Sequence, residues 1–189
     1  MNIKGKRVVI RAIERGDLEM LQAWSNDPEI QSQLGGWHFP SSMQTMEDWL
    51  ERVCKDTLNQ RFAIEATGHG LIGTCNLVDI NWKDRNAFHG ILLGSNLVRG
   101  KGFGQDTVMA IMRYSFDELG LERLDSSIIE FNEPSKKLYI QKCGWKEEGR
   151  KRNAYWRNGR FWDKLIVGIN RDDYLALVEK NRYWQTPDE

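Results

Sequence analysis

One glycine-rich segment of this sequence, Arg99–Gly104 (RGKGFG), stands between two stretches of different periodicity. Before it, Ala87–Leu93 is short, largely apolar and rich in branched residues, which predicts a buried strand. After it, apolar residues recur at helical spacing as far as Gly120, a typical residue at a helix C-terminus, and Leu124–Glu130 predicts a second strand. A strand, a helix and a strand within about 45 residues predict a parallel crossover. The glycine-rich loop then lies at the carboxyl end of a strand, where open sheets bind ligands.

The segments on either side of this unit predict a mixed α/β fold. Further strands are expected at Arg7–Ile13, Arg61–Ala66 and Leu71–Ile80, the last two joined by a turn at Gly68–Gly70, with a hairpin about Asn158-Gly159. One helix is expected around Leu18, Leu21 and Trp24 with its end at Pro28, and a second after a capping box of Ser41 and Gln44. Two more are expected over Ser135–Lys142 and after a cap at Asn170. We therefore expect one domain over residues 1–189, with a twisted mixed sheet of about seven strands and flanking helices.

Composition excludes several classes of protein. The 27 Lys plus Arg and 27 Asp plus Glu give a formal charge of zero, which disfavours nucleic acid as a partner. No apolar run reaches the roughly 18 residues of a membrane span, and the start of the chain lacks the core of a signal peptide, so we expect a cytoplasmic protein without a membrane partner. The three cysteines form no C-x-x-C pair and His38, His69 and His89 are scattered, so we expect no disulfide framework and no bound metal.

Charge is divided along the chain. From Glu14 to Glu51, eight acidic residues accompany one basic residue, a net charge of −7. From Lys136 to Lys164, ten basic residues accompany three acidic ones, a net charge of +7. Each stretch is either a solvated face of the fold or part of a binding surface.

The glycine-rich loop has the chemistry of a phosphate site, because exposed amides at a helix N-terminus attract anions. It is not a Walker loop, since the residue after Lys101 is glycine and offers no hydroxyl for magnesium, and its glycines do not have the spacing of a dinucleotide fingerprint. It does match an Arg/Gln-x-x-Gly-x-Gly/Ala loop through Arg99, Gly102 and Gly104. On this motif the chain resembles the GNAT superfamily of acetyl-CoA-dependent N-acetyltransferases.

A second motif, about 30 residues later, strengthens the resemblance. The family's pattern Asn-x-x-Ala-x-x-Leu-Tyr-x-x-x-Gly-Phe is matched by Asn132, Leu138, Tyr139, Gly144 and Trp145, with Ser135 in place of Ala. One extra residue separates Tyr139 from Gly144, which leaves the helix register open there.

Two more segments bear on the resemblance. The loop after Leu93 is lengthened by Gly94-Ser95-Asn96-Leu97 relative to the family. Near the end of the chain, Glu148–Arg150 and Asn158–Asp163 resemble the branch that holds ribosomal-protein and spermidine N-acetyltransferases.

The resemblance implies that acetyl-CoA is bound as the acyl donor and that no metal is required. It implies that main-chain groups of Ile91, Leu92 and Leu93 pair with the pantetheine arm of the coenzyme, and that Asn132 hydrogen-bonds this arm. The pyrophosphate is then held by the amides of the loop, formed by Arg99, Gly100, Lys101, Gly102, Phe103 and Gly104.

The implied reaction is direct attack of a primary amine on the thioester, which needs an acid for the thiolate, an oxyanion site and a base. Tyr139 matches the family's acid, and a backbone amide near Leu92–Leu93 is the expected oxyanion donor. His89 is our first candidate for the base, because it lies in the cofactor strand and histidine titrates near neutral pH. Glu65 and Glu130 are its rivals.

The acceptor we expect is a small cationic, polyamine-like amine, because in the resemblance the acidic stretch Glu14–Glu51 lines the acceptor side. Two alternatives stay open. One is a protein N-terminal acetyltransferase of the ribosomal-protein type. The other is a non-catalytic acyl-CoA- or RNA-binding module that uses Arg150–Arg152 with Trp156 and Trp162. A homo-oligomer is compatible with this sequence.

Overall fold

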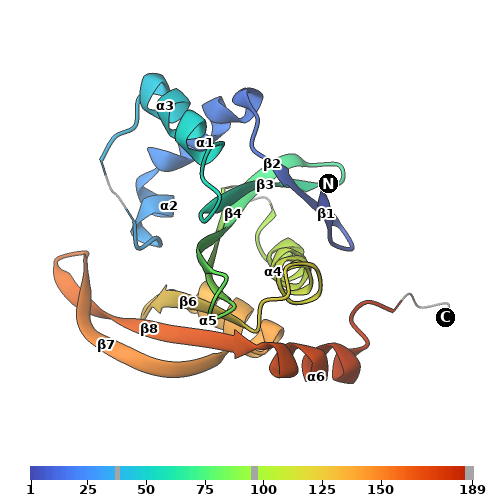
Figure 1. The fold of residues 1–189 in the computed structure, drawn as a ribbon. Helices are drawn as coiled ribbons and strands as arrows, with labels where there is room; N and C mark the ends of the chain where they lie inside the picture. Colours follow the sequence, from blue (N-terminus) through green and yellow to red (C-terminus); the bar gives the residue numbers. More distant parts are fainter. Residues whose placement is uncertain (37–38, 95–97, 186–189) are drawn as a thin grey trace.

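A single sheet organises the computed structural model, which describes residues 1–36, 39–94 and 98–185 (Figure 1). Its strands are β1 (Ile3–Lys4), β2 (Val8–Ala12), β3 (Gln60–Ala66), β4 (Gly70–Asn81), β5 (Asn86–Leu93), β6 (Arg123–Ile129), β7 (Lys146–Arg157) and β8 (Arg160–Asn170). The order across the sheet is β1-β2-β3-β4-β5-β6-β8-β7. The mixed α/β architecture is confirmed. The sheet has eight strands instead of about seven, because Ile3–Lys4 pairs with β2 as a short edge strand.

Helices flank this sheet. They are α1 (Leu18–Ser25), α2 (Pro28–Ser32), α3 (Met43–Val53), α4 (Phe103–Arg113), α5 (Glu133–Lys136) and α6 (Arg171–Asn181), with a 3₁₀ turn η1 (Arg15–Asp17) and the π-helical turns η3 (Tyr114–Glu118) and η4 (Lys137–Lys142). In the part of the chain that the structure describes, no helix combines the length and apolar character that a membrane span requires.

The junction between β5 and β6 positions the site. These two strands are parallel, as the crossover predicted, whereas the other neighbouring strands pair antiparallel. Their paired residues end at Phe88 and Asp125, although β5 continues to Leu93 and β6 to Ile129. The strands therefore separate, and the main chain of β5 beyond Phe88 has an edge without a β6 partner. Backbone groups on such an edge are available to a ligand.

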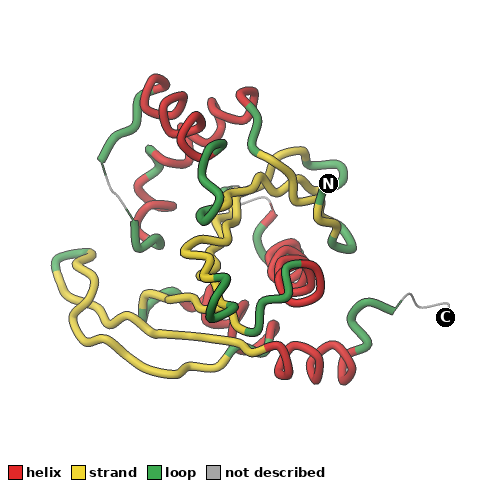
Figure 2. The backbone as a smooth tube through the Cα atoms, viewed as in Figure 1, coloured by secondary structure: helices red, strands yellow, loops and turns green. Residues whose placement is uncertain are grey.

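Two hydrophobic clusters lie on opposite faces of the sheet. Figure 2 shows α4 on one side of the central strands and α1, α2 and α3 on the other. Ile91 and Leu93 pack against the cluster that contains α4 residues, whereas Leu92 packs against the cluster that contains Leu21 and Trp24 of α1. This division follows from the alternation of side chains along a strand. The end of β5 is thus covered from both faces.

Several element boundaries differ from the expected ones. Pro28 does not end α1 but begins α2, where proline fits because the first helical N–H has no partner, and Asp27 caps this helix. Ser42, not Ser41, caps α3 by accepting from the Thr45 amide. The helix expected to begin at Ser135 begins at Glu133, since Asn132 supplies its cap.

The extra residue between Tyr139 and Gly144 is accommodated by a change in helix type. The chain forms a π-helical turn at Lys137–Lys142 and ends it at Gly144, which has a left-handed φ of 74°. A π-bulge takes in one more residue than an α-turn, and such bulges are frequent at functional sites. This π-helical turn sets the helix register between Tyr139 and Gly144, which the sequence leaves open.

Candidate active site

The glycine-rich loop forms the N-terminal end of α4, at the end of β5. Gly102 is the N-cap of α4 with φ of 88°, and Gly100 has φ of 76°, a region that side chains disfavour. Gly104 lies in the first turn, where a Cβ would stand 3.4 Å from Leu93 and Leu138. The loop main chain therefore curves tightly round the helix end, and its first N–H groups point outward as an anion site requires.

This loop is anchored by the N-terminal strands. The buried carboxylate of Asp106, in the first turn of α4, accepts from the amides of Lys6, Arg7 and Val8 at 2.9, 2.7 and 3.1 Å. The Arg7 side chain donates to the carbonyl of Lys101 at 2.6 Å and its guanidinium lies 4.4 Å from the centre of the Phe103 ring. Arg7 thus places a fixed positive charge beside the loop.

Sequence reasoning missed Arg7 and Asp106. The two residues are 99 positions apart in the chain, and no local pattern links a charged residue of the β1–β2 turn to a helix so far away. An acidic residue in the first turn of a helix predicts a favourable interaction with the helix dipole. It does not predict that Asp106 is buried and accepts hydrogen bonds from the chain before β2.

Arg99, the first residue of the matched loop, faces two groups. Its Nη1 lies 3.8 Å from a Glu29 carboxylate oxygen on α2, and its Nη2 donates to the carbonyl of Leu93 at 3.5 Å. Both side chains of the ion pair are well exposed, so the pair is weak and easily exchanged. Of the lengthened loop Gly94–Leu97, residues 95–97 lie outside the described residues.

His89 points to the α4 face of the sheet, not to the face that α1, α2 and α3 cover. Its side chain is 0% exposed, and its Nδ1 lies 2.8 Å from the Asn76 carbonyl oxygen. Burial lowers the pKa of His89 to about 4, so the ring is neutral at neutral pH. A base must reach the incoming amine, and the geometry does not favour His89 for that task.

The buried histidine predicts a pH-dependent stability. The unfolded chain binds a proton near pH 6.5, whereas folded His89 binds one only near pH 4, so stability is lost as the pH falls between these values. From about pH 7.5 to about pH 5, His89 should lower the free energy of unfolding by about 2 kcal/mol. Urea unfolding of His89→Gln should show a smaller fall than the wild type over this range. His69→Gln, which removes an exposed histidine, is the control, and equal falls in wild type and His89→Gln would contradict the prediction.

Tyr139 lies in η4 beside the point where β5 and β6 separate. It is 3% exposed, and its ring centre is 5.9 Å from that of His89 and 4.9 Å from that of Trp145. Burial raises the pKa of Tyr139, and a nearby Ser126 hydroxyl acts in the opposite direction. The phenol therefore keeps its proton at neutral pH, as a proton donor must.

Asn132 follows β6 and connects two parts of the site. Its Oδ1 accepts from the Ser135 amide at 3.0 Å and its Nδ2 donates to the Gln33 carbonyl at 3.2 Å. The side chain thus caps α5 and holds the chain after α2 against the end of β6. Its expected contact with pantetheine stays a prediction.

The two rival bases are both paired. Glu65 accepts from Arg11 at 2.7 Å, and Glu130 accepts from Arg150 at 2.9 Å. An oxygen of each carboxylate is therefore already engaged by a guanidinium. Neither residue gains support as the base from these contacts.

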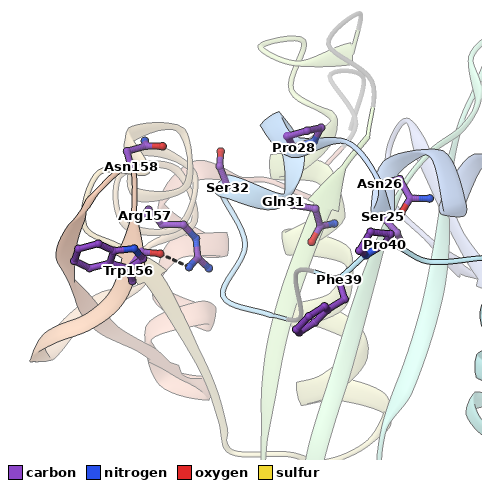
Figure 3. A pocket seen from close by; sticks show the side chains of 10 residues that line it. All are labelled: Ser25, Asn26, Pro28, Gln31, Ser32, Phe39, Pro40, Trp156, Arg157 and Asn158. Atoms are coloured by element: carbon purple, nitrogen blue, oxygen red, sulfur yellow. Dashed lines mark hydrogen bonds between the residues drawn. The ribbon is translucent and has the colours of Figure 1, made fainter.

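A groove lies between α2, the chain at Phe39-Pro40 and the tip of the β7–β8 hairpin (Figure 3). Its volume is about 570 Å³. The described lining residues are Ser25, Asn26, Pro28, Gln31, Ser32, Phe39, Pro40, Trp156, Arg157 and Asn158. The Arg157 guanidinium donates to the carbonyl of its chain neighbour Trp156 at 2.7 Å and to the carbonyl of Leu34 at 2.8 Å. The groove offers aromatic rings, amides and one cation, and it contains no acidic side chain among these residues.

Metal-ligating side chains are not gathered in this region. Over residues 1–36, 39–94 and 98–185, no group of three His, Cys, Asp or Glu side chains could hold a metal ion. His38 lies outside the described residues.

Comparison with known proteins identifies the family. The sequence model of the family described as "Acetyltransferase (GNAT) domain" matches residues 7–146, which include the glycine-rich loop and Tyr139. The chain belongs to the GNAT acetyltransferase family. The site described above is therefore the candidate active site of a GNAT N-acetyltransferase, with the family's mixed fold.

Individual GNAT relatives cover nearly the whole chain. Spermidine N(1)-acetyltransferase of Vibrio cholerae is 29% identical over 173 residues, which are 92% of this chain and 98% of that protein. A Bacillus subtilis protein named "SPbeta prophage-derived uncharacterized N-acetyltransferase YokL" is 28% identical over 171 residues, 90% of this chain and 93% of that protein. A crystal structure of the Vibrio cholerae spermidine N-acetyltransferase in complex with CoA and spermine matches with a TM-score of 0.82 at 29% identity, covering 89% of this chain and 98% of that one.

Proposed function

We propose that this GNAT domain, spanning residues 1–189, transfers an acetyl group from acetyl-CoA to a primary amine by direct attack in a ternary complex. The separation of β5 from β6 beside the glycine-rich loop carries the proposal. The free edge of β5 supports a pantetheine arm paired with this strand, and the glycine-rich loop at the end of the same strand supports a pyrophosphate site beside it. Release of free thiol from acetyl-CoA across a panel of amines tests it, and no release with any amine would contradict it.

The coenzyme would be held by groups at the end of β5 and the start of α4. Main-chain groups of Ile91, Leu92 and Leu93 would pair with the pantetheine arm, and Asn132, which follows the neighbouring strand β6, would hydrogen-bond it. The amides of Arg99, Gly100, Lys101, Gly102, Phe103 and Gly104 face the pyrophosphate, with the α4 dipole behind them. Arg7 adds a cation that the loop itself does not supply.

The chemical step is the attack of a neutral amine on the thioester carbonyl. The carbonyl oxygen gains negative charge, and a backbone N–H near Leu92–Leu93 would donate to it. The C–S bond then breaks, and Tyr139 gives its phenolic proton to the thiolate. The proton that the amine loses passes to a base or a water chain on the α1–α3 side, which His89 does not face.

For the acceptor we propose a small polyamine-like cation, which rests on the acidic stretch Glu14–Glu51 and on the relatives named for spermidine. Some of these carboxylates have partners, since Glu47 lies 3.2 Å from Arg15 and Glu29 lies 3.8 Å from Arg99. Ion pairs as exposed as these contribute only about 0.2–1 kcal/mol each. A polycation can therefore displace them, and Asp48 accepts a neutral hydrogen bond from Gln44.

A comparison of acceptors tests this class. Spermidine should be acetylated in preference to an amino-sugar nucleotide, with a KM that rises several-fold from about 0.01 to about 1 M salt, where the Debye length falls from about 30 to about 3 Å. The combined variant Glu47→Gln with Asp48→Asn should raise the KM for spermidine at low salt. Glu118→Gln, an exposed carboxylate outside the acidic stretch, is its matched control. Preference for the nucleotide, or a KM for spermidine that does not change with salt, would contradict the polyamine proposal.

A second acceptor, the N-terminus of a protein, is favoured by the groove of Figure 3. Its amide side chains and the Arg157 guanidinium suit the carbonyl groups of an extended peptide, and Phe39 and Trp156 suit apolar side chains. Thiol release with short peptides, before and after their α-amine is blocked, distinguishes this acceptor from a polyamine.

The RNA-binding module is not pursued, because the family and its named relatives are acetyltransferases. The basic side chain of Arg150 is also engaged by Glu130 and Glu147, which reduces its use as a phosphate contact. For the cell compartment, we propose the cytoplasm, where acetyl-CoA is available to such an enzyme.

A further inference from the structure

Three buried rings meet at the point where β5 and β6 separate. The side chains of His89, Tyr139 and Trp145 are 0%, 3% and 1% exposed. Their ring centres lie 5.9 Å apart for His89 and Tyr139, 6.2 Å for His89 and Trp145, and 4.9 Å for Tyr139 and Trp145. These residues come from β5, η4 and the chain before β7, so the cluster exists only in the folded protein.

Each ring presents a buried polar atom that makes no hydrogen bond of normal geometry in the described chain, although the Ser126 hydroxyl lies near the Tyr139 oxygen. These atoms are His89 Nε2, Tyr139 Oη and Trp145 Nε1. The other ring nitrogen of His89 lies 2.8 Å from the Asn76 carbonyl oxygen, so in the neutral ring Nδ1 carries the hydrogen and donates it. Nε2 is then a pure acceptor, while the indole N–H of Trp145 is a pure donor.

Buried polar atoms are rarely left without partners, because each loses its hydrogen bond to water. One water molecule can accept from the indole N–H with one of its lone pairs and can donate its two hydrogens to two acceptors. The three atoms of the cluster are one donor, one acceptor and one hydroxyl, which matches a water with about three partners, as buried waters usually have. The chemistry of the cluster therefore fits a single shared water.

We propose that His89, Tyr139 and Trp145 hold one buried water and that His89 is a positioning residue for the acid Tyr139. The water accepts from Trp145 Nε1 and donates one hydrogen to His89 Nε2 and the other to the phenolic oxygen of Tyr139. The hydroxyl hydrogen of Tyr139 is then left to point at the coenzyme sulfur. This proposal rests on the proposed function through the role of Tyr139.

The proton balance of a turnover agrees with this arrangement. The O–H bond of Tyr139 breaks as an S–H bond forms on the leaving thiol, and the water's hydrogen bond stabilises the phenolate that remains. The phenolate regains a proton from solvent, to which the attacking amine has given one. His89 stays neutral throughout, in agreement with its burial.

Trp145 is where this chain departs from the family pattern in a chemically meaningful way. The pattern places Phe at this position, and a phenyl ring cannot donate a hydrogen bond. In this chain the indole N–H completes the set of partners for the water.

Variants of His89 and Trp145 test the proposal. His89→Leu removes the acceptor and should lower kcat by about 10- to 100-fold, since small displacements of a reacting group cost that much, with the KM for acetyl-CoA unchanged. His89→Gln keeps a side-chain acceptor and should retain most of the activity, and Trp145→Phe should lower kcat. Ser115→Ala is the matched control, because it removes a buried, unpartnered hydroxyl outside the cluster. Circular dichroism checks that each variant is folded.

A double-mutant cycle with Tyr139→Phe separates this proposal from the proposed function. His89→Leu should cause no further loss of kcat in the Tyr139→Phe background. An equal loss in both backgrounds would mean that His89 acts independently of Tyr139 and would overturn the proposal. Wild-type kcat in Tyr139→Phe would overturn the acid role, and the positioning role with it, but not acetyl transfer.

A high-resolution crystal structure supplies a readout that does not depend on activity. Density for one water within hydrogen-bonding distance of the three atoms is expected in the wild type, and none is expected in His89→Leu. Wild-type density without this water would overturn the proposal even if every amine were found inactive as an acceptor.

Discussion

Replacement of Gly102 by glutamate is expected to weaken acetyl-CoA binding by about 100-fold or more while the domain stays folded. Two effects act together. Gly102 has φ of 88°, which a side chain disfavours, and the new carboxylate stands where the loop amides and Arg7 would meet the pyrophosphate. Repulsion between like charges in such a contact costs several kcal/mol, and about 1.4 kcal/mol is a factor of ten in affinity. Calorimetric titration with acetyl-CoA measures the effect.

Gly159→Glu is the matched control for this variant. Gly159 also has a left-handed φ, 74°, with no atom within 4 Å of the point where a Cβ would stand, and it lies at the tip of the β7–β8 hairpin. It should therefore suffer the same backbone strain and keep its affinity for acetyl-CoA. Equal affinities of wild type and a folded Gly102→Glu variant would remove the assignment of this loop to the pyrophosphate.

Tyr139→Phe is expected to lower kcat by about 10²–10⁴, the usual contribution of a general acid, with little change in acetyl-CoA affinity. The substitution keeps the ring that packs against His89 and Trp145 and removes only the hydroxyl. Burial keeps the phenol protonated, and the ring itself is unchanged in the variant. A fall in kcat would therefore report the missing proton donor and not a change in packing. Steady-state kinetics with calorimetry for the coenzyme separates kcat from binding.

Tyr174→Phe controls for the loss of a buried hydroxyl. Tyr174 is 2% exposed and its hydroxyl accepts from the Trp184 indole, near the C-terminal helix and away from the β5–β6 junction. It should change stability and leave kcat unaltered. A Tyr139→Phe enzyme with wild-type kcat would mean that the thiolate leaves without a proton from Tyr139.

The positions of Tyr139 and His89 relative to the sheet bear on their proposed roles. The rings of both residues lie together on the α4 face of the sheet. Leu92 points to the opposite face, which α1, α2 and α3 cover and from which the proposed acceptor would enter. Neighbouring residues of a strand point in opposite directions, so the place of His89 in β5 does not by itself predict which face its ring occupies.

The sequence alone determined the crossover and its loop. The hydrophobic periodicity is that of a strand before Arg99–Gly104 and that of a helix after it. Glycine is needed within this loop for a backbone conformation that other residues avoid. Such signals are local, so they can be read without the fold. The hairpin at Asn158-Gly159 and the turn at Gly68–Gly70 are local in the same sense, and both are present in the structure.

Contacts between residues far apart in the chain are visible only in the fold. Arg7 and Asp106 form one anchor for the loop, and His89, Tyr139 and Trp145 form one buried cluster, although no short-range pattern connects their positions. The tertiary structure also assigned His89 to the α4 face and absorbed the extra residue before Gly144 in a π-helical turn. The physical reason is that periodicity fixes which residues share a face of their own element, whereas packing between elements decides what that face meets.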